Sequence, residues 1–285
     1  MKQLILKLCS TIVAVLLCTS AASYAFATDS ITDEMQLNEY EYIKTLAYKN
    51  DQNTDDSSTL LEKYYSDLNK RAALPKDQLI GLGYTETEIA ILKKLELRKG
   101  LSDAELKSVS ATLTGKIIKH SFSSQGTQFS YQWEWNHCPI VTDVDAAAIS
   151  WTCYNTNGHV ATLIHDDDND LYQVFYYFGD THVSTRKGKM ESGLNAGAVN
   201  MRFDVAVLLD DQMTYMYAKK GIVKVSLKVP DTKAASLAYV YTQGAYGHKT
   251  VGIGSPSVSI SSNSISFSVS PGVVEKLGFK EKYIS

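Results

Sequence analysis

Residues 129–135 read Phe-Ser-Tyr-Gln-Trp-Glu-Trp, and residues 147–153 read Ala-Ala-Ile-Ser-Trp-Thr-Cys. In both stretches every second residue is apolar or aromatic, and the residues between them in 129–135 are polar. Successive side chains of a β-strand point to opposite faces, so this alternation predicts two strands that each bury one face.

The chain that follows repeats the strand signal. Residues 171–178 are apolar or aromatic at almost every position, which predicts a strand covered on both sides. Residues 199–209 predict one long alternating strand, and shorter runs continue to residue 269. Turn signals such as Asn157-Gly158 and Ser262-Asn263 separate the runs, without helices between them. We therefore expect an antiparallel β-sandwich, followed by a short helix that begins at Pro271.

The chain before residue 115 has a helical pattern instead. Residues 31–49 carry apolar side chains three and four positions apart, as in an amphipathic helix. Thr85 with Glu88, and Ser102 with Glu105, have the spacing of capping boxes that open two further helices. The predicted fold class is thus α+β, with a small N-terminal helical domain over 28–115 and a β-sandwich domain over 116–285.

The first 27 residues have the pattern of a cleavable signal peptide. Lys2 and Lys7 precede a short apolar run, and Ala25-Phe26-Ala27 supplies small residues where a signal peptidase cuts. Lipidation at Cys18 is the less favoured alternative, because Leu17 is too large for that site. We therefore expect a secreted, extracellular protein without stable membrane insertion. The formal net charge of −3 gives no general attraction for nucleic acid.

Residues 79–89 read Leu-Ile-Gly-Leu-Gly-Tyr-Thr-Glu-Thr-Glu-Ile. This segment resembles one found in uncharacterised secreted proteins of Gram-positive bacteria. The likeness extends through residues 133–135, Cys138-Pro139, Asp145 and Trp151. It is weaker over 241–261, where such proteins tend to carry His-Thr in place of His248-Lys249-Thr250. The resemblance implies export and the same architecture, but no transferable function.

Two cysteines remain after residue 27, Cys138 and Cys153. In an oxidising compartment such a pair favours a disulfide over two free thiols. A Cys138 nucleophile served by His137 is the alternative, but neighbours on a strand point to opposite faces.

Two further groups are candidate sites. Trp133, Trp135 and Trp151 form either an aromatic platform for a sugar or peptide side chain, or part of the core around the disulfide. Asp166, Asp168 and Asp170 form either a weak Ca²⁺ site or a solvated hairpin tip, and the pattern is not an EF-hand. No cofactor is expected.

The function predicted from these patterns is a non-enzymatic binding module for a carbohydrate or protein ligand. Neither a G-x-S-x-G elbow nor an H-E-x-x-H motif is present. The alternative is a secreted hydrolase that acts on a polymer through a carboxylate pair, with Glu134 as first candidate. The third is a membrane-active protein, suggested by the serine-rich amphipathic hairpin expected over 257–270.

Overall fold

A computed structural model describes residues 34–51, 57–97, 100–140, 142–193, 197–209, 214–230, 236–248, 257–261, 264–268 and 281–284. Residues Asp33–Ser285 form one compact unit. The expected signal peptide and the short helix expected from Pro271 lie outside the described residues.

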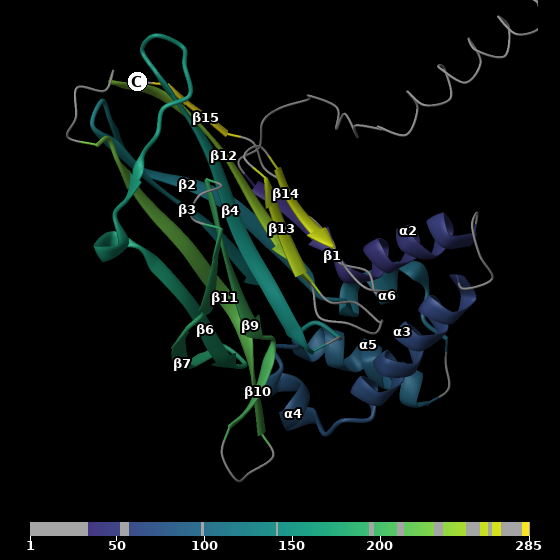
Figure 1. Cartoon of the computed structure of the whole chain (residues 1–285). Helices are drawn as coiled ribbons and strands as arrows, with labels where there is room; N and C mark the ends of the chain where they lie inside the picture. Colours follow the sequence, from purple (N-terminus) through teal and green to yellow (C-terminus); the bar gives the residue numbers. More distant parts are fainter. Residues whose placement is uncertain are drawn as a thin grey trace, which may run out of the picture. The chain divides into compact units, whose positions relative to one another are not determined.

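Two antiparallel sheets dominate the described chain (Figure 1). The larger sheet has the spatial order β1 (Glu34–Asn38), β2 (Thr112–Ser123), β3 (Gly126–Trp135), β11 (Thr214–Lys228), β6 (Leu171–Phe178) and β7 (Thr181–Lys187), and β5 (Ile164–His165) and β10 (Ala206–Leu209) also pair with β11. The smaller sheet has the order β15 (Glu281–Ile284), β12 (Leu237–Gly247), β4 (Val144–Asn155), β9 (Ala198–Asp204) and β8 (Lys189–Gly193). The prediction of antiparallel sheets is confirmed.

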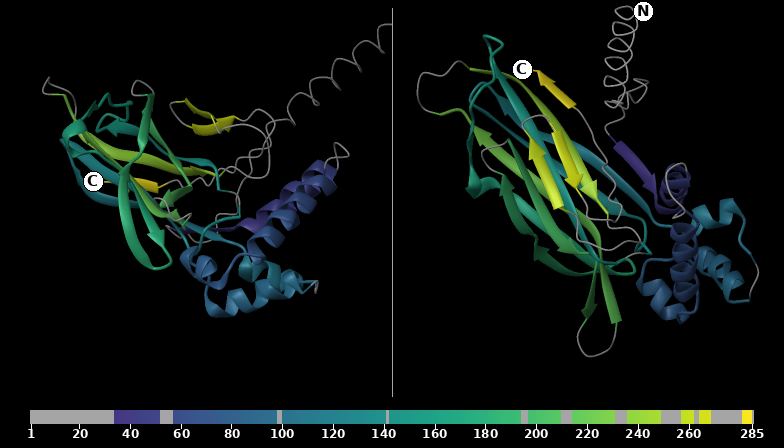
Figure 2. Two further views of the ribbon diagram at one scale, coloured as in Figure 1. Left: turned by 90° about the horizontal axis from the view of Figure 1, so that it is seen from below. Right: turned by 45° about the vertical axis from the view of Figure 1, so that its right-hand side comes forward.

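A separate serine-rich hairpin joins β13 (Ser257–Ser261) to β14 (Ser264–Ser268), as the sequence predicts. It lies against β4, β9 and β12 of the smaller sheet. Figure 2 shows it, in yellow, over the outer face of that sheet.

The helices are α2 (Glu39–Asp51), α3 (Ser57–Ala72), α4 (Lys76–Gly81), α5 (Glu86–Glu96) and α6 (Asp103–Val109). Both capping boxes are present, at the start of α5 and of α6. The helices share a hydrophobic cluster that Cys138, Ile140 and Tyr217 from the sheet region complete. An independent helical domain is therefore not confirmed.

The first expected helix begins later than predicted. Residues 34–38 instead form edge strand β1, which pairs with β2. Asn38 sets the boundary: its side-chain oxygen accepts from the Glu41 amide at 3.3 Å, in the manner of a helix N-cap. Its side-chain nitrogen donates to the carbonyls of Lys107 and Ser110. Strand pairing, which has no local sequence signal, overrides the helical periodicity here.

The long strand expected over 199–209 is two strands in different sheets. β9 belongs to the smaller sheet and β10 to the larger one, and the chain crosses between them at Val205. The Val205 amide donates to Asp143 O and its carbonyl accepts from the Ala218 amide, both at 2.8 Å. Alternation continues through the crossing, so the sequence pattern alone shows no break.

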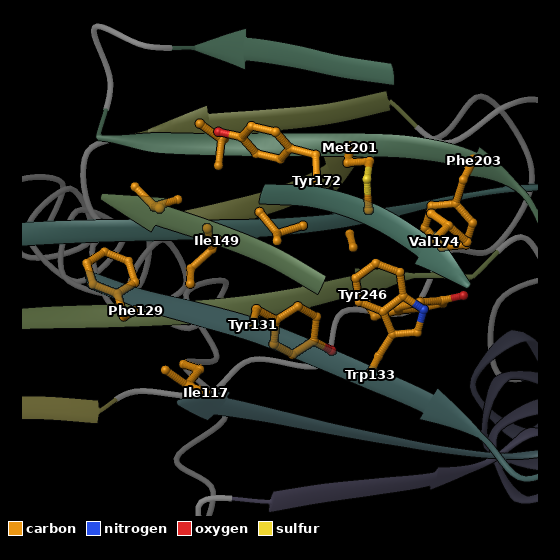
Figure 3. Packing of buried hydrophobic residues seen from close by; sticks show 14 of the residues in the cluster. Ile117, Phe129, Tyr131, Trp133, Ile149, Tyr172, Val174, Met201, Phe203 and Tyr246 are labelled. Atoms are coloured by element: carbon orange, nitrogen blue, oxygen red, sulfur yellow. The ribbon is translucent and has the colours of Figure 1, made fainter. Parts of the chain in front are cut away.

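The two sheets enclose one hydrophobic cluster with an aromatic centre (Figure 3). Trp133 lies parallel to Phe203, with ring centroids 5.2 Å apart, and edge-on to Tyr246. In the pairing register, Trp133 lies between Gly115 on β2 and Gly221 on β11. A Cβ atom on Gly221 would collide with the Trp133 ring. The packing of this ring thus requires glycine on the neighbouring strand.

A buried charged cluster joins helix α2 to the smaller sheet. His248 Nδ1 lies 2.9 Å from Asp145 Oδ2, and its Nε2 lies 3.5 Å from Glu39 Oε1. Tyr246 donates to Asp145 at 2.8 Å and accepts from Trp135 Nε1 at 3.0 Å. Burial lowers the pKa of His248, but the charges and hydrogen bonds of Asp145 and Glu39 outweigh it and raise the pKa to about 10.

The loop over 136–140 is tied to the helices by direct hydrogen bonds. Arg71 donates to the carbonyls of Cys138 at 3.2 Å and Pro139 at 2.9 Å. The Cys138 amide donates to Leu82 O at 2.8 Å, and both Glu39 carboxylate oxygens accept from the Ile140 amide. The buried charged side chains of Arg71 and Glu39 therefore have backbone hydrogen-bond partners at the junction between the helices and the sheets.

We expect Gly221→Ala to lower the free energy of unfolding by about 1–3 kcal/mol, because the added methyl group overpacks the space that Trp133 fills. Urea denaturation measures the change. Gly100→Ala is the matched control: no heavy atom lies within 4 Å of its Cβ position, so its effect stays within about 1 kcal/mol. Equal effects at the two glycines would contradict the packing argument.

We expect the protein to lose stability as the pH rises from about 6.5 to about 10. The folded-state pKa of His248 is raised above its ordinary value of 6.5, so its contribution is complete below that value and is lost as the pH passes the folded pKa. The loss is on the order of 3–5 kcal/mol, from roughly 1.4 kcal/mol per pKa unit.

Denaturant unfolding at a series of pH values tests this expectation. His248→Gln should lower stability at neutral pH, since Asp145 and Glu39 lose their cation, and should flatten the decline. His182→Gln, at an exposed histidine on β7, should keep the profile of the unmodified protein. If stability declined with pH by the same amount in both variants, titratable groups other than His248 would cause the decline.

Candidate functional site

A groove of about 920 Å³ lies on the larger sheet, on the face directed away from the shared core. Its size is typical of ligand-binding clefts. Five strands contribute to it: β1, β2, β3, β11 and β6. Its lining residues are Glu34, Gln36, Thr112, Thr114, Lys116, Gln132, Trp133, Glu134, Asn136, Leu171, Phe175, Tyr177, Lys220, Gly221 and Ile222.

The centre of the groove lies on the pairing of β3 with β11. Trp133 and Gly221 are register partners there, and Glu134 pairs with Lys220 beside them. The Lys220 ammonium lies 3.0 Å from the Glu134 carboxylate, and both side chains are close to half-exposed. Because Trp133 faces the core, its neighbours Gln132 and Glu134 face the groove. Both charge signs are thus present on one surface.

One wall of the groove is apolar. Leu171 and Phe175 of β6 lie beside Ile222 of β11, and all three are half-buried. The sequence predicts β6 to be covered on both sides, which is wrong: only Tyr172 and Val174, with Tyr176, are buried. The apolar side chains at the alternate positions line the groove instead. Apolar or aromatic residues at three of the four outer positions of β6, namely Leu171, Phe175 and Tyr177, are the sequence signal for this wall.

The aromatic ring of Tyr177 is surrounded by polar groups. The His182 ring centroid lies 5.4 Å away at an interplanar angle of 63°. Lys219 Nζ and Lys220 Nζ lie 5.5 and 6.0 Å from the ring centroid, within the range of cation–π contacts. His182 also lies 6.1 Å from the Phe175 ring. The rings at this wall are therefore already in contact with side chains of the protein.

The structure separates the three tryptophans. Trp133 and Trp135 are 2% and 0% exposed and belong to the core between the sheets. Trp151 is partly exposed, packs edge-on to Phe129 at 6.0 Å, and stacks on His165 at 5.9 Å. It lines a second, smaller hollow on the other sheet. The three rings do not form one platform, although two of them contact a concave surface.

The acidic tip does not bring its carboxylates together. Asp170 accepts from Tyr172 Oη at 2.9 Å and from the Ser226 amide at 2.8 Å. Asp166 accepts from Asn169 across the short 3₁₀ turn η1 (Asp167–Asn169), while Asp168 is exposed. No group of three potential metal-binding side chains occurs among the described residues. The Ca²⁺ interpretation therefore gains no support.

Cys138 and Cys153 are free, buried thiols, so the expected disulfide is absent. They belong to different hydrophobic clusters, Cys138 to that of the helices and Cys153 to that between the sheets. Burial raises the pKa of Cys138 to about 11, although Arg71 acts in the opposite direction. Burial also raises the pKa of Cys153, to about 12. A nucleophilic role for Cys138 is disfavoured, since the thiolate is the reactive form.

Comparison with known proteins identifies no family. No family model and no curated protein matches the chain. Among solved structures, the collagen-binding subdomain of the Enterococcus faecalis surface protein ACE is similar over 60% of this chain and 96% of its own, at 8% identity and a TM-score of 0.30. AvmM, which catalyses macrocyclization in alchivemycin A biosynthesis, is similar over 59% and 87%, at 10% identity and a TM-score of 0.24. Likeness at this level indicates neither a shared fold nor a shared function.

Within the described part of the chain, no helix is both long and apolar enough to cross a membrane. The resemblance to secreted Gram-positive proteins stays a prediction.

We expect both thiols to resist alkylation in the folded protein, because each is buried and its pKa is raised. Iodoacetamide treatment at neutral pH, followed by peptide mass spectrometry, should show Cys138 and Cys153 unmodified. The same treatment in concentrated urea should modify both. A cross-linked peptide that contains both residues would show instead that the disulfide forms.

Proposed function

We propose that this protein is an extracellular, non-enzymatic binding module, and that the groove on the larger sheet holds an extended segment of a protein partner. The groove is the observation that carries the proposal. It is the largest concave surface described above, and side chains of five strands meet in it. The extracellular location rests on the signal-peptide pattern of residues 1–27.

The chemistry of the lining favours a polypeptide over a sugar. An extended peptide presents alternating side chains, so it can place apolar groups against Phe175 and Ile222 and charged groups near Lys116 and Glu34. Gln132 adds a side-chain amide that can bind peptide groups. A sugar, in contrast, needs an open ring face, and the rings at this wall already contact His182 and the lysines.

The surroundings of Glu134 favour binding over catalysis. A carboxyl group that acts as a general acid near neutral pH is typically buried in an apolar pocket or lies beside a second carboxylate. Glu134 is instead close to half-exposed and is paired with the Lys220 ammonium. The polymer hydrolase therefore remains the alternative. Hydrolysis of a glycan or peptide substrate that is lost in Glu134→Gln would favour it.

We expect Phe175→Ala combined with Ile222→Ser to weaken peptide binding at least about tenfold, or ~1.4 kcal/mol, because the apolar wall is lost. The probe is a set of linear peptides selected from a phage-displayed library on the unmodified protein. The selected peptides should alternate apolar and charged residues. Fluorescence anisotropy with the synthetic peptides measures affinity.

Leu208→Ser is the matched control, since Leu208 is 52% exposed on β10 and lies outside the groove. It should bind the selected peptides like the unmodified protein. The proposal fails if selection yields no peptide, or if the selected peptides bind the double variant as tightly as the control.

A further inference from the structure

The smaller sheet carries an aromatic surface on its outer face that the groove does not involve. Tyr154 on β4 and Tyr239 on β12 are register partners whose rings stack, with centroids 4.7 Å apart and planes 20° apart. Tyr241, two residues along β12, stands perpendicular to both, at 5.9 Å from Tyr154 and 5.4 Å from Tyr239. Tyr241 is 38% exposed. We call these three residues the tyrosine cluster.

A hollow of about 300 Å³ adjoins the tyrosine cluster. The residues that line it are Ser150, Trp151, Thr152, Tyr154, Tyr241, Thr242 and Gln243. All seven are uncharged. Among its described residues, the lining thus combines aromatic rings with hydroxyl and amide groups, and none of these residues offers an ion pair to a charged ligand.

One polar atom on the outer face of β12, Gln243 Oε1, is buried without a hydrogen-bond partner among the described residues. Thr242 contributes to the lining from the next position, but it pairs with Trp151 and its side chain faces the core. Buried polar atoms in folded proteins nearly always have partners, and leaving one unsatisfied costs free energy. The position of Gln243 in the lining of the hollow suggests that a bound molecule supplies the missing partner.

We propose that this hollow is a second binding site, and that it takes a neutral sugar unit of a glycan. A sugar presents apolar C–H groups on one face, which pack against the exposed part of the Tyr241 ring, and hydroxyl groups at its edge. A hydroxyl group both donates and accepts, so it satisfies Gln243 in either orientation of the side-chain amide.

A proline-rich peptide is the other ligand that aromatic surfaces commonly bind. It fits this hollow less well, because proline has no N–H group to donate to Gln243 Oε1. The hollow is also about a third the volume of the groove, as suits one or a few sugar rings rather than an extended chain. The site lies on the other sheet and rests on separate observations, so it does not depend on the proposed peptide groove.

The full-length protein tests the inference on an array of immobilised neutral and acidic glycans, with an oligoproline peptide as a further probe. We expect binding to neutral glycans. Calorimetry with the best soluble oligosaccharide from the array should show affinity at least about tenfold weaker in Tyr241→Ala and in Gln243→Ala.

Two controls separate this site from other surfaces. Tyr215→Ala removes another tyrosine, 51% exposed on β11, and should bind the oligosaccharide normally. The groove variant with Phe175→Ala and Ile222→Ser should also bind it normally. The inference is overturned if no neutral glycan binds, if acidic glycans or oligoproline bind in preference, or if Tyr241→Ala retains full affinity.

Discussion

The sheets depend on one packing constraint. Two aromatic rings on β3 pack against glycine positions of other strands, where no side chain is present. Tyr131 and Trp133 occupy the space that a side chain on Gly115, Gly221 or Gly244 would fill, and these glycines belong to three other strands. Two of the strands lie beside β3 and one lies across the core. The contacts between these large rings and the glycine backbone therefore fix the register of the strands.

The same register determines the composition of the outer face. A shift of β3 by one residue would send Gln132 and Glu134 into the core and Trp133 into solvent. The pairing of Glu134 with Lys220 across the groove thus follows from the position of Trp133 opposite Gly221. The core and the groove are two sides of one strand alignment, so changes at the core glycines also alter the groove.

Local patterns in the sequence predict the local structure well. The alternation in 129–135 and 147–153 corresponds to β3 and β4, and both capping boxes open helices at the predicted residues. These features depend on side chains a few positions apart, so a single sequence contains their full signal. The buried position of Trp133 and Trp135 follows from the same alternation.

Features that depend on distant segments could not be predicted in this way. β1 is a strand only because β2, which lies over 70 residues later, pairs with it. The crossing at Val205 and the groove depend on which strands become neighbours. The prediction of a disulfide is wrong for the same reason: closeness in sequence says nothing about which hydrophobic cluster each thiol enters. The apolar outer positions of β6 did carry a signal for the groove, but a doubly covered strand has the same pattern.

The separate burial of the two thiols has a consequence for how the fold depends on the redox conditions around it. Neither cluster needs a covalent link between cysteines, and each thiol is protonated and shielded within its own core. The packing of both clusters is thus the same in a reducing medium and in an oxidising one. No bond between Cys138 and Cys153 has to form before these clusters can pack. A reducing agent, equally, has no bond between these two residues to break.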